Sequence, residues 1–346
     1  MESLDFPLST KTKRQILAGI FNCEIDSIAV SELLVFSDSY FAYYTKSLET
    51  CRASSLISSH REIVNLLVNV QRIDVTRSSV EEFLRKRLVD KEIDEEEECV
   101  DDTIDLVLRL LLMVPTGGYT TASRSITLSG GTKFNWKSGT VQELVQREFG
   151  LQNSMKEPIK LEKIFNARNL ERIAGVEVRW TCNLADHLRM RDDDKAVEVF
   201  HYATYLKLQQ NASILPGPFV EETMRTLALL LPEHDKNIET WFSKHETRLQ
   251  KRRKLPLDPL ARECGQLKVE ERQIDQFHYW HDRLVILKQV FDEAEPRNIK
   301  QWWRDRRRRV QWYTFWVAAI VLALTVFFGT VQSVEGAMQV WLAMNS

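Results

Sequence analysis

The chain has 346 residues, of which 28% are charged and 44% hydrophobic, so most of it can form a folded core rather than stay disordered. Lys and Arg number 47 and Asp and Glu 49, and the net charge of −2 argues against a globally basic nucleic-acid binder. With 12 glycines and 9 prolines, a collagen-like or proline-rich scaffold is excluded. The length suits about two ordinary domains.

The cysteines indicate a reducing compartment. They are odd in number, widely spaced and contain no C-x-x-C pair, which argues against a disulfide framework or a zinc ribbon. The five are Cys23, Cys51, Cys99, Cys182 and Cys264.

The N-terminal region, residues 1–100, is predicted to be helical. Its first 14 residues mix charges with no apolar core, so they do not form a secretory signal peptide. Apolar residues then recur at helical spacing, as in Ile16, Leu17, Ile20 and Phe21. The apolar stretch 106–114 is too short to cross a bilayer and contains Arg109, so we expect a core helix there.

Residues 101–235 are predicted to form a small α+β unit. Ser138 or Thr140 can cap a helix, and Gly175 can end another. Residues 176–180 alternate strictly between apolar and polar, as in a half-buried strand, and 197–202 can form a return strand. Helix, strand, helix, helix, strand, excursion, strand is the order of a winged helix, here over residues 103–205. An unclassified α+β unit is the alternative.

The next segments carry more charge. Residues 236–265 read as a charged, exposed linker with a basic run at 251–254, which suits a nuclear import signal, a lipid-facing patch or a solvated loop. Residues 266–310 read as a helical stalk with a basic juxtamembrane segment. Phe277, Trp280, Leu284, Leu287 and Phe291 share one helical face there, which we expect to pack on its own domain.

A transmembrane helix is predicted over residues 311–334. Residues 312–331 contain no Asp, Glu, Lys or Arg and would extend about 30 Å as a helix, the thickness of a bilayer core. Ten of these residues are Leu, Ile, Val or Phe, which together favour insertion by ~3–6 kcal/mol. A short tail, 335–346, follows.

The flanks of this segment predict its orientation. Upstream lie five arginines within six residues, whereas the tail has no Lys or Arg, so the positive-inside rule places the bulk of the chain in the cytosol. So short a tail favours post-translational, tail-anchored insertion, with the endoplasmic reticulum or nuclear envelope as the favoured membrane. The flanking basic residues are Arg304, Arg306, Arg307, Arg308 and Arg309, and the interface aromatics are Trp302, Trp303, Trp312, Tyr313 and Trp316.

No catalytic motif emerges from the sequence. The phosphate-loop, dinucleotide, nucleophile-elbow and H-E-x-x-H patterns are missing, so no catalytic, cofactor-binding or metal-ligating residues are assigned. Asp186 and His187 near Cys182 lack an orienting third group for a nucleophile pair. His278 and His281 share a helical face but have no accompanying carboxylate at the spacing of a di-iron site.

Several segments resemble a group of uncharacterised single-pass membrane proteins from filamentous fungi. The resemblance spans about the last half of the chain. It implies a C-terminal membrane helix and brings no activity or catalytic residues, and Cys182 stands where that group is expected to have Asp or Ser. The segments include Asn183-Leu184-Ala185-Asp186-His187-Leu188 and Arg309-Val310-Gln311-Trp312-Tyr313-Thr314-Phe315-Trp316.

The sequence thus predicts a mainly α fold with a small β component (α+β) and a single C-terminal transmembrane helix. We expect a non-enzymatic interaction module with a lipid bilayer and an unidentified protein as its partners. A membrane-tethered winged-helix nucleic-acid-binding factor is the alternative, although its presumptive recognition helix carries Glu171 between Arg168 and Arg172, a poor phosphate-binding surface. An enzyme with an unrecognised site is the third hypothesis.

Overall fold

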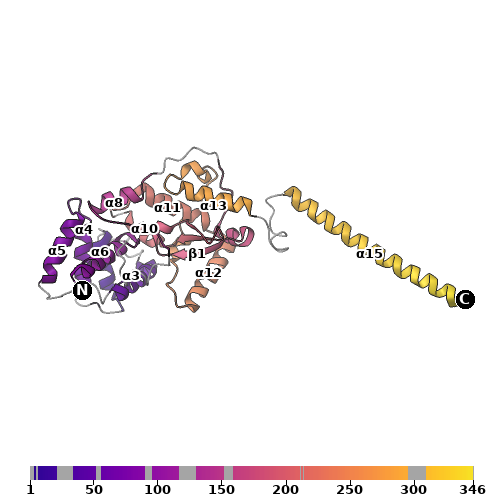
Figure 1. Cartoon of the computed structure of the whole chain (residues 1–346), viewed down its shortest axis with the longest axis horizontal. Helices are drawn as coiled ribbons and strands as arrows, with labels where there is room; N and C mark the ends of the chain where they lie inside the picture. Colours follow the sequence, from indigo (N-terminus) through magenta and orange to yellow (C-terminus); the bar gives the residue numbers. More distant parts are fainter. Residues whose placement is uncertain are drawn as a thin grey trace.

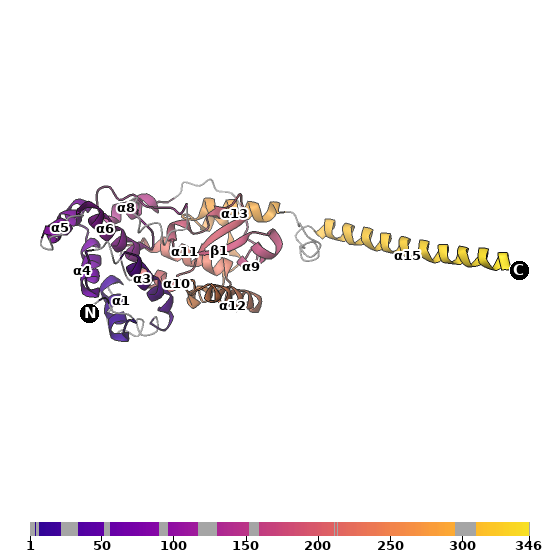
Figure 2. The same cartoon turned by 60° about the horizontal axis from the view of Figure 1, so that its bottom comes forward.

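The structure is a computed structural model with a folded body and one long helix that extends away from it (Figures 1 and 2). It describes residues 4, 7–21, 34–51, 56–89, 96–116, 130–151, 159–210, 212, 214–294 and 309–345. The body is mainly helical with one small sheet, which confirms the predicted fold class.

Helices form the N-terminal end of the body. α6 lies at their centre, packed by α3, α4 and α5, while α1 packs on α4. Residues 106–114 are buried, which confirms a core helix rather than a membrane span. The bounds are α1 (Thr10–Phe21), α3 (Asp38–Cys51), α4 (His60–Val70), α5 (Arg77–Val89) and α6 (Glu96–Leu112).

This helical part shares one core with the rest of the body. The Tyr205 hydroxyl donates to the Leu111 carbonyl at 2.7 Å, and the Leu184 N–H donates to the Met113 carbonyl at 2.9 Å. The boundary that the sequence suggested at residue 100 falls inside α6. Buried side chains of α6 therefore pack in a core that continues into the sheet region.

The sheet has three strands in the order β1-β3-β2, with β1 (Glu177–Thr181), β2 (Met190–Arg191) and β3 (Ala196–Phe200). β3 is central and wholly buried, runs parallel to β1 and pairs antiparallel with the short β2. A winged helix would pair its last two long strands as an antiparallel hairpin. The parallel β1–β3 pair therefore differs from the winged-helix alternative, although both strands lie close to the segments 176–180 and 197–202 that the sequence suggested.

Local signals explain the helices that surround the sheet. Thr140 and Glu143 form a capping box at the start of α8 (Val141–Glu148), as the sequence predicted. α9 (Ala167–Asn169) and the π-helical turn η1 (Leu170–Ala174) end at Gly175, whose φ of 72° confirms the expected C-cap. α10 (Ala203–Gln209) and α11 (Gly217–Leu230) follow the sheet, and α11 ends just before Pro232.

The stretch expected to be an exposed linker instead begins with α12 (Lys236–Lys251). Ile238, Trp241, Phe242 and His245 are buried on one face, spaced at i, i+3, i+4 and i+7. This face packs against α9, and Trp241 and His245 both donate to the Glu171 carboxylate. α12 therefore covers the presumptive recognition helix, and the Glu171 carboxylate of that helix accepts hydrogen bonds from α12.

The segment after α12 consists of short 3₁₀ turns followed by one helix. η3 (Pro259–Arg262), η4 (Glu270–Arg272) and η5 (Ile274–Gln276) lead into α13 (His281–Glu293). Leu284, Leu287 and Phe291 of α13 are buried, and α13 packs on η1, as expected of a helix that packs on its own domain.

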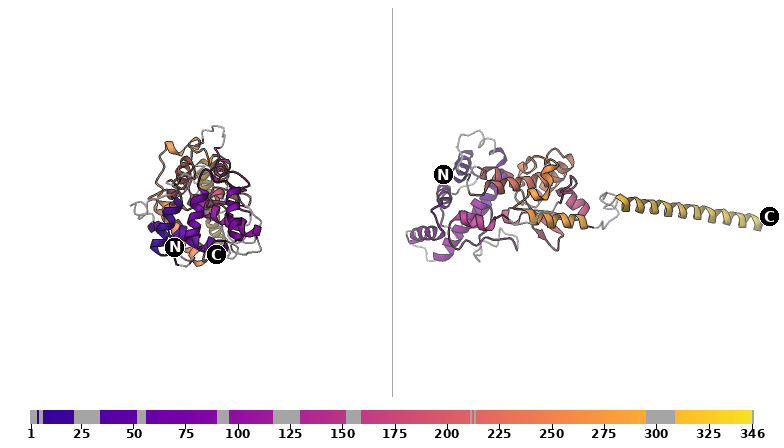
Figure 3. Two further views of the ribbon diagram at one scale, coloured as in Figure 1. Left: turned by 90° about the vertical axis from the view of Figure 1, so that its left-hand side faces the viewer. Right: turned by 90° about the horizontal axis from the view of Figure 1, so that it is seen from above.

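α15 (Arg309–Asn345) is a continuous helix of 37 residues. It points away from the body in Figures 1 and 2 and in the right panel of Figure 3. The predicted transmembrane segment and its tail thus form one helix through Asn345.

Candidate functional site

α15 has the length and composition of a membrane-spanning helix. Its apolar part, Tyr313–Met344, comprises 32 residues and is 0% buried in the structure. At ~1.5 Å per residue it extends about 48 Å, longer than a hydrocarbon core of about 30 Å. Glu335 lies about 33 Å from Tyr313 on the same scale, so the stretch before it is sufficient to cross a bilayer.

The hydroxyls within this helix have hydrogen-bond partners. Thr325 and Ser333 donate to the carbonyls of Val321 and Gly329, each four residues earlier, at 2.8 Å. Thr330 donates to the Val326 carbonyl at 2.9 Å. Since each hydroxyl proton is satisfied by the helix itself, these residues add little to the cost of insertion.

The structure describes only part of the membrane flank predicted from sequence. The side chain of Tyr313 is exposed, and Trp316 is half-buried. Arg309 and Trp312 lie in the first turn of α15, where the structure describes only the backbone. The other flanking residues lie outside the described ranges; they are Trp302, Trp303, Arg304, Arg306, Arg307 and Arg308.

A second candidate site, missed from sequence, lies where the sheet meets the N-terminal helices. It is a cavity of about 300 Å³, which we call the junction cavity. Because β1 and β3 are parallel, their carboxyl ends meet at one edge of the sheet, where residues 180–183 and 201–202 line it. α3, α6, the end of α12 and the segment after it supply other lining residues, including Tyr43, Lys46, Arg109, Leu249, Lys254 and Leu255.

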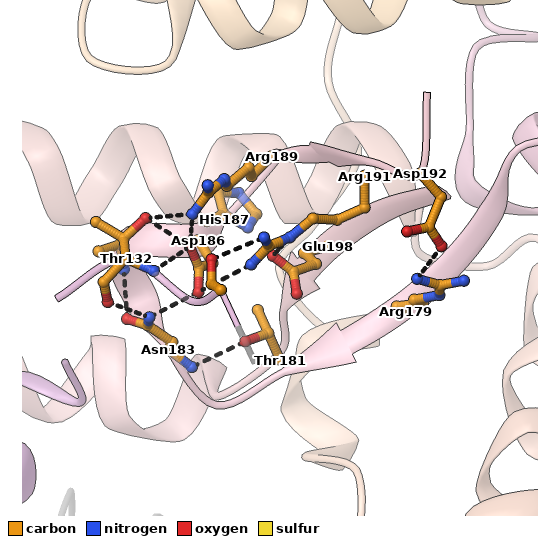
Figure 4. Close-up of polar contacts among 12 residues, drawn as sticks. Thr132, Arg179, Thr181, Asn183, Asp186, His187, Arg189, Arg191, Asp192 and Glu198 are labelled. Carbon is orange, nitrogen blue, oxygen red and sulfur yellow. Dashed lines mark hydrogen bonds and ion pairs between the residues drawn. The ribbon is translucent and has the colours of Figure 1, made fainter. Parts of the chain in front are cut away.

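The turn after β1 is held by a buried carboxylate (Figure 4). One oxygen of Asp186 accepts from the Thr132 N–H and hydroxyl at 2.9 and 2.6 Å, and from Arg189 at 3.0 Å. The other accepts from the Asn183 amide at 2.7 Å. Asn183 also caps the turn by accepting from the Ala185 N–H. The Asn183–Leu188 segment is therefore a rigid polar turn that forms one wall of the junction cavity.

Arg191 links this turn to the central strand. Its guanidinium donates to Glu198 at 2.9 Å and lies 3.8 Å from the second Asp186 oxygen. Burial raises the pKa of Glu198, and Arg191 opposes that rise. Both acids of the cavity are thus paired with arginines (Figure 4).

The thiol and imidazole at the cavity do not form an activated nucleophile pair. Burial raises the pKa of Cys182, and the opposing effect of Arg109 and Lys46 is smaller, so the thiol stays protonated at neutral pH. Burial lowers the pKa of His201 to about 3, and its Nδ1 accepts from the Asp258 N–H at 3.2 Å. His187, near Cys182 in sequence, is held elsewhere, between Thr226 and the Phe200 N–H.

Metal ligation finds no support in the described part of the chain, where no group of three His, Cys, Asp or Glu is placed to hold an ion. Of the two histidines that share a helical face in the sequence, only His281 lies in α13, and its Nδ1 is 3.1 Å from Asp282. The backbone N–H of His278 is instead bound by the Glu222 carboxylate.

Comparisons with known proteins add no family assignment. The chain matches no protein-family model, no curated protein and no solved structure. The functional argument therefore rests on α15 and on the geometry of the body.

Proposed function

We propose that this protein is a tail-anchored, single-pass membrane protein whose body lies in the cytosol as a non-enzymatic interaction module. The observation that carries the proposal is α15, a helix of membrane-spanning length with an apolar part that is 0% buried. In water, this helix would expose a continuous apolar surface, which soluble monomers avoid. A lipid bilayer removes that surface from water without any contact to the body.

The arginine-rich flank supports the proposed orientation. Arg304 to Arg309 precede the apolar part of the helix, while residues 332–346 contain no Lys or Arg. Each basic residue near an anionic cytoplasmic leaflet adds about 1 kcal/mol of attraction. We propose the endoplasmic reticulum or the nuclear envelope as the membrane, and membership of the fungal single-pass group that the C-terminal half resembles.

The exposed face of α12 supports an interaction role for the body. Lys236, Lys244, Arg248 and Lys251 lie along one shallow groove on that face with a single acid, Glu239. The basic run 251–254 continues from the end of the helix and is exposed. Such a surface attracts acidic partners through long-range electrostatics. We therefore place the proposed protein-binding surface here.

Membrane insertion is tested by two arginines at the middle of the span. Val321→Arg with Leu324→Arg adds about 5–7 kcal/mol to the cost of insertion and removes two of the ten apolar residues, changes that together offset what the remaining apolar residues provide. The double variant should be removed from membranes by alkaline extraction, whereas the matched Val321→Ala with Leu324→Ala variant should stay. Extraction of the unmodified chain would refute the anchor.

Orientation is tested with glycosylation sites on both sides. An acceptor added after Ser346 should be glycosylated if the tail enters the endoplasmic reticulum. The natural Asn211-Ala212-Ser213 sequon provides the internal control, because in a cytosolic body it stays unmodified. The opposite pattern, with the body glycosylated and the tail bare, would reverse the proposed topology. For another membrane, protease protection of the tail but not the body gives the same answer.

A further inference from the structure

We infer that the junction cavity binds a small organic anion, a carboxylate or phosphate ester carried on a short apolar or aromatic body. The site lies outside the carboxyl ends of two parallel strands. In open α/β sheets, ligands bind in the crevice outside the carboxyl ends of the strands, where the loops that leave neighbouring strands separate. The inference does not depend on the membrane anchor.

One buried tyrosine hydroxyl on the cavity wall lacks a hydrogen-bond partner among the described residues. Tyr202 lines the cavity and is fully buried, and its hydroxyl has no hydrogen-bond partner among the described residues. Tyr43, also on the cavity wall, donates its own hydroxyl to the Arg109 carbonyl at 3.2 Å. Because a buried hydroxyl is costly to leave unbonded, a ligand in the cavity can supply the acceptor that no described residue provides.

The charges around the cavity favour an anion. Arg109 is buried in the wall, where Asp105 balances its charge, so the positive charge open to a ligand is that of the exposed Lys46 and Lys254 at the rim. No described carboxylate lies within 4 Å of either lysine ammonium. The wall acids Asp186 and Glu198 are already paired with Arg189 and Arg191. Electrostatic attraction toward the cavity entrance therefore acts on negative ligands.

The remaining walls define the body of the ligand. Trp180, Leu249, Leu255 and Pro115 supply aromatic and aliphatic surface. A volume of about 300 Å³ is at the lower end for small-molecule sites, so a single ring or short chain fits better than a nucleotide. An anionic group can then meet Tyr202 and the cations while the ring lies against Trp180.

The test uses the full chain in lipid nanodiscs with three fluorinated probes. Line broadening of the ¹⁹F signal measures binding of 4-fluorobenzoate, 4-fluorophenyl phosphate and the neutral 4-fluorobenzyl alcohol. We expect one or both anions to bind and the alcohol to bind at least ten-fold more weakly. A preference between the two anions distinguishes a carboxylate ligand from a phosphate ester. Equal binding of the alcohol, or binding of neither anion, would overturn the inference.

Variants then locate the bound anion. Tyr202→Phe removes only the hydroxyl and should weaken anion binding about ten-fold, as expected for a hydrogen bond to a charged group. Lys46→Gln with Lys254→Gln should weaken it several-fold and reduce its salt dependence. Two matched variants should leave binding unchanged: Tyr205→Phe, a buried tyrosine outside the cavity, and Lys163→Gln, an exposed lysine outside both the cavity and the α12 groove. Anion binding that survives both cavity variants would place the anion elsewhere and refute the site.

Discussion

The carboxylate of Glu222 in α11 accepts a hydrogen bond from the backbone N–H of Trp280 at 2.8 Å, directly before α13. The same carboxylate also accepts from the N–H groups of His278 and Tyr279 at 2.7 and 2.8 Å. A buried side chain from another helix thus binds the three backbone N–H groups directly before α13, and its charge is favourable near a helix N-terminus. This contact fixes the last helix of the body against α11.

Glu222→Gln should destabilise the body by about 2–3 kcal/mol, because one oxygen becomes an NH₂ that faces backbone donors. Amide hydrogen exchange at Tyr279 and Trp280 should accelerate more than exchange in α6. The matched control is Glu221→Gln, the exposed neighbour in the same helix, which should change stability by less than about 0.5 kcal/mol. Similar effects of the two substitutions would contradict the role of Glu222 in holding the segment before α13.

Two buried histidines make the body sensitive to acid. Burial lowers the pKa of His187 and His201 to about 3, whereas an unfolded histidine titrates near 6.5. Between these values only the unfolded chain binds the protons, so stability is present above about pH 6.5 and is lost as pH falls. At pH 5 each histidine should cost up to about 2 kcal/mol relative to pH 7.5.

Thermal unfolding at pH 7.5 and 5.0 measures this loss. His187→Gln should shrink the difference between the two pH values by roughly one histidine's share, even if the variant is less stable at both. His234→Gln provides the control, since that side chain is 83% exposed. If the loss at pH 5 is as large in His187→Gln as in the unmodified chain, His187 is not the group that titrates.

Asp258 should act in the opposite direction. Burial raises its pKa to about 7, although Thr204 and the Leu260 N–H donate hydrogen bonds that favour the charged form. The folded chain therefore keeps a proton that the unfolded chain loses above about pH 4, so this contribution to stability falls as pH rises from about 4 to 7. Asp258→Asn removes the titration. The variant should be destabilised more at pH 5 than at pH 8, measured as the difference in unfolding temperature from the unmodified chain; a constant difference would contradict the raised pKa.

Signals carried by neighbouring residues were sufficient to predict much of the fold. The capping box at Thr140, the C-cap at Gly175 and the helix end before Pro232 each depend on a few adjacent residues. The apolar segment of α15 is equally local, because twenty residues without charge are enough to suggest a membrane span.

Features that depend on distant residues were not predictable in the same way. Strict alternation predicted β1, but alternation contains no information on strand direction, so the parallel pairing with β3 was missed. The junction cavity depends on that direction, since it brings Cys182 and Tyr202 to one edge beside Arg109 of α6. α12, in contrast, could have been predicted from neighbouring residues. Its apolar face recurs at helical spacing in Ile238, Trp241, Phe242 and His245, but the many charged residues between them led to the prediction of an exposed linker.

The Asp186 network gives a prediction for the wall of the junction cavity. Asp186→Asn removes a buried charge that accepts from Arg189 and lies near Arg191, so the partly exposed Arg189 loses its counter-ion while Arg191 keeps Glu198. We expect a loss of about 1–2 kcal/mol in unfolding free energy, mainly from the hydrogen bonds that the buried carboxylate accepts. Asp193→Asn is the matched control: it makes the same chemical change at an exposed turn residue with φ of 51°, a conformation that Asn accepts readily. The measurement is the thermal unfolding temperature of both variants. If the Asp186 network did not stabilise the fold, Asp186→Asn would unfold at the same temperature as Asp193→Asn.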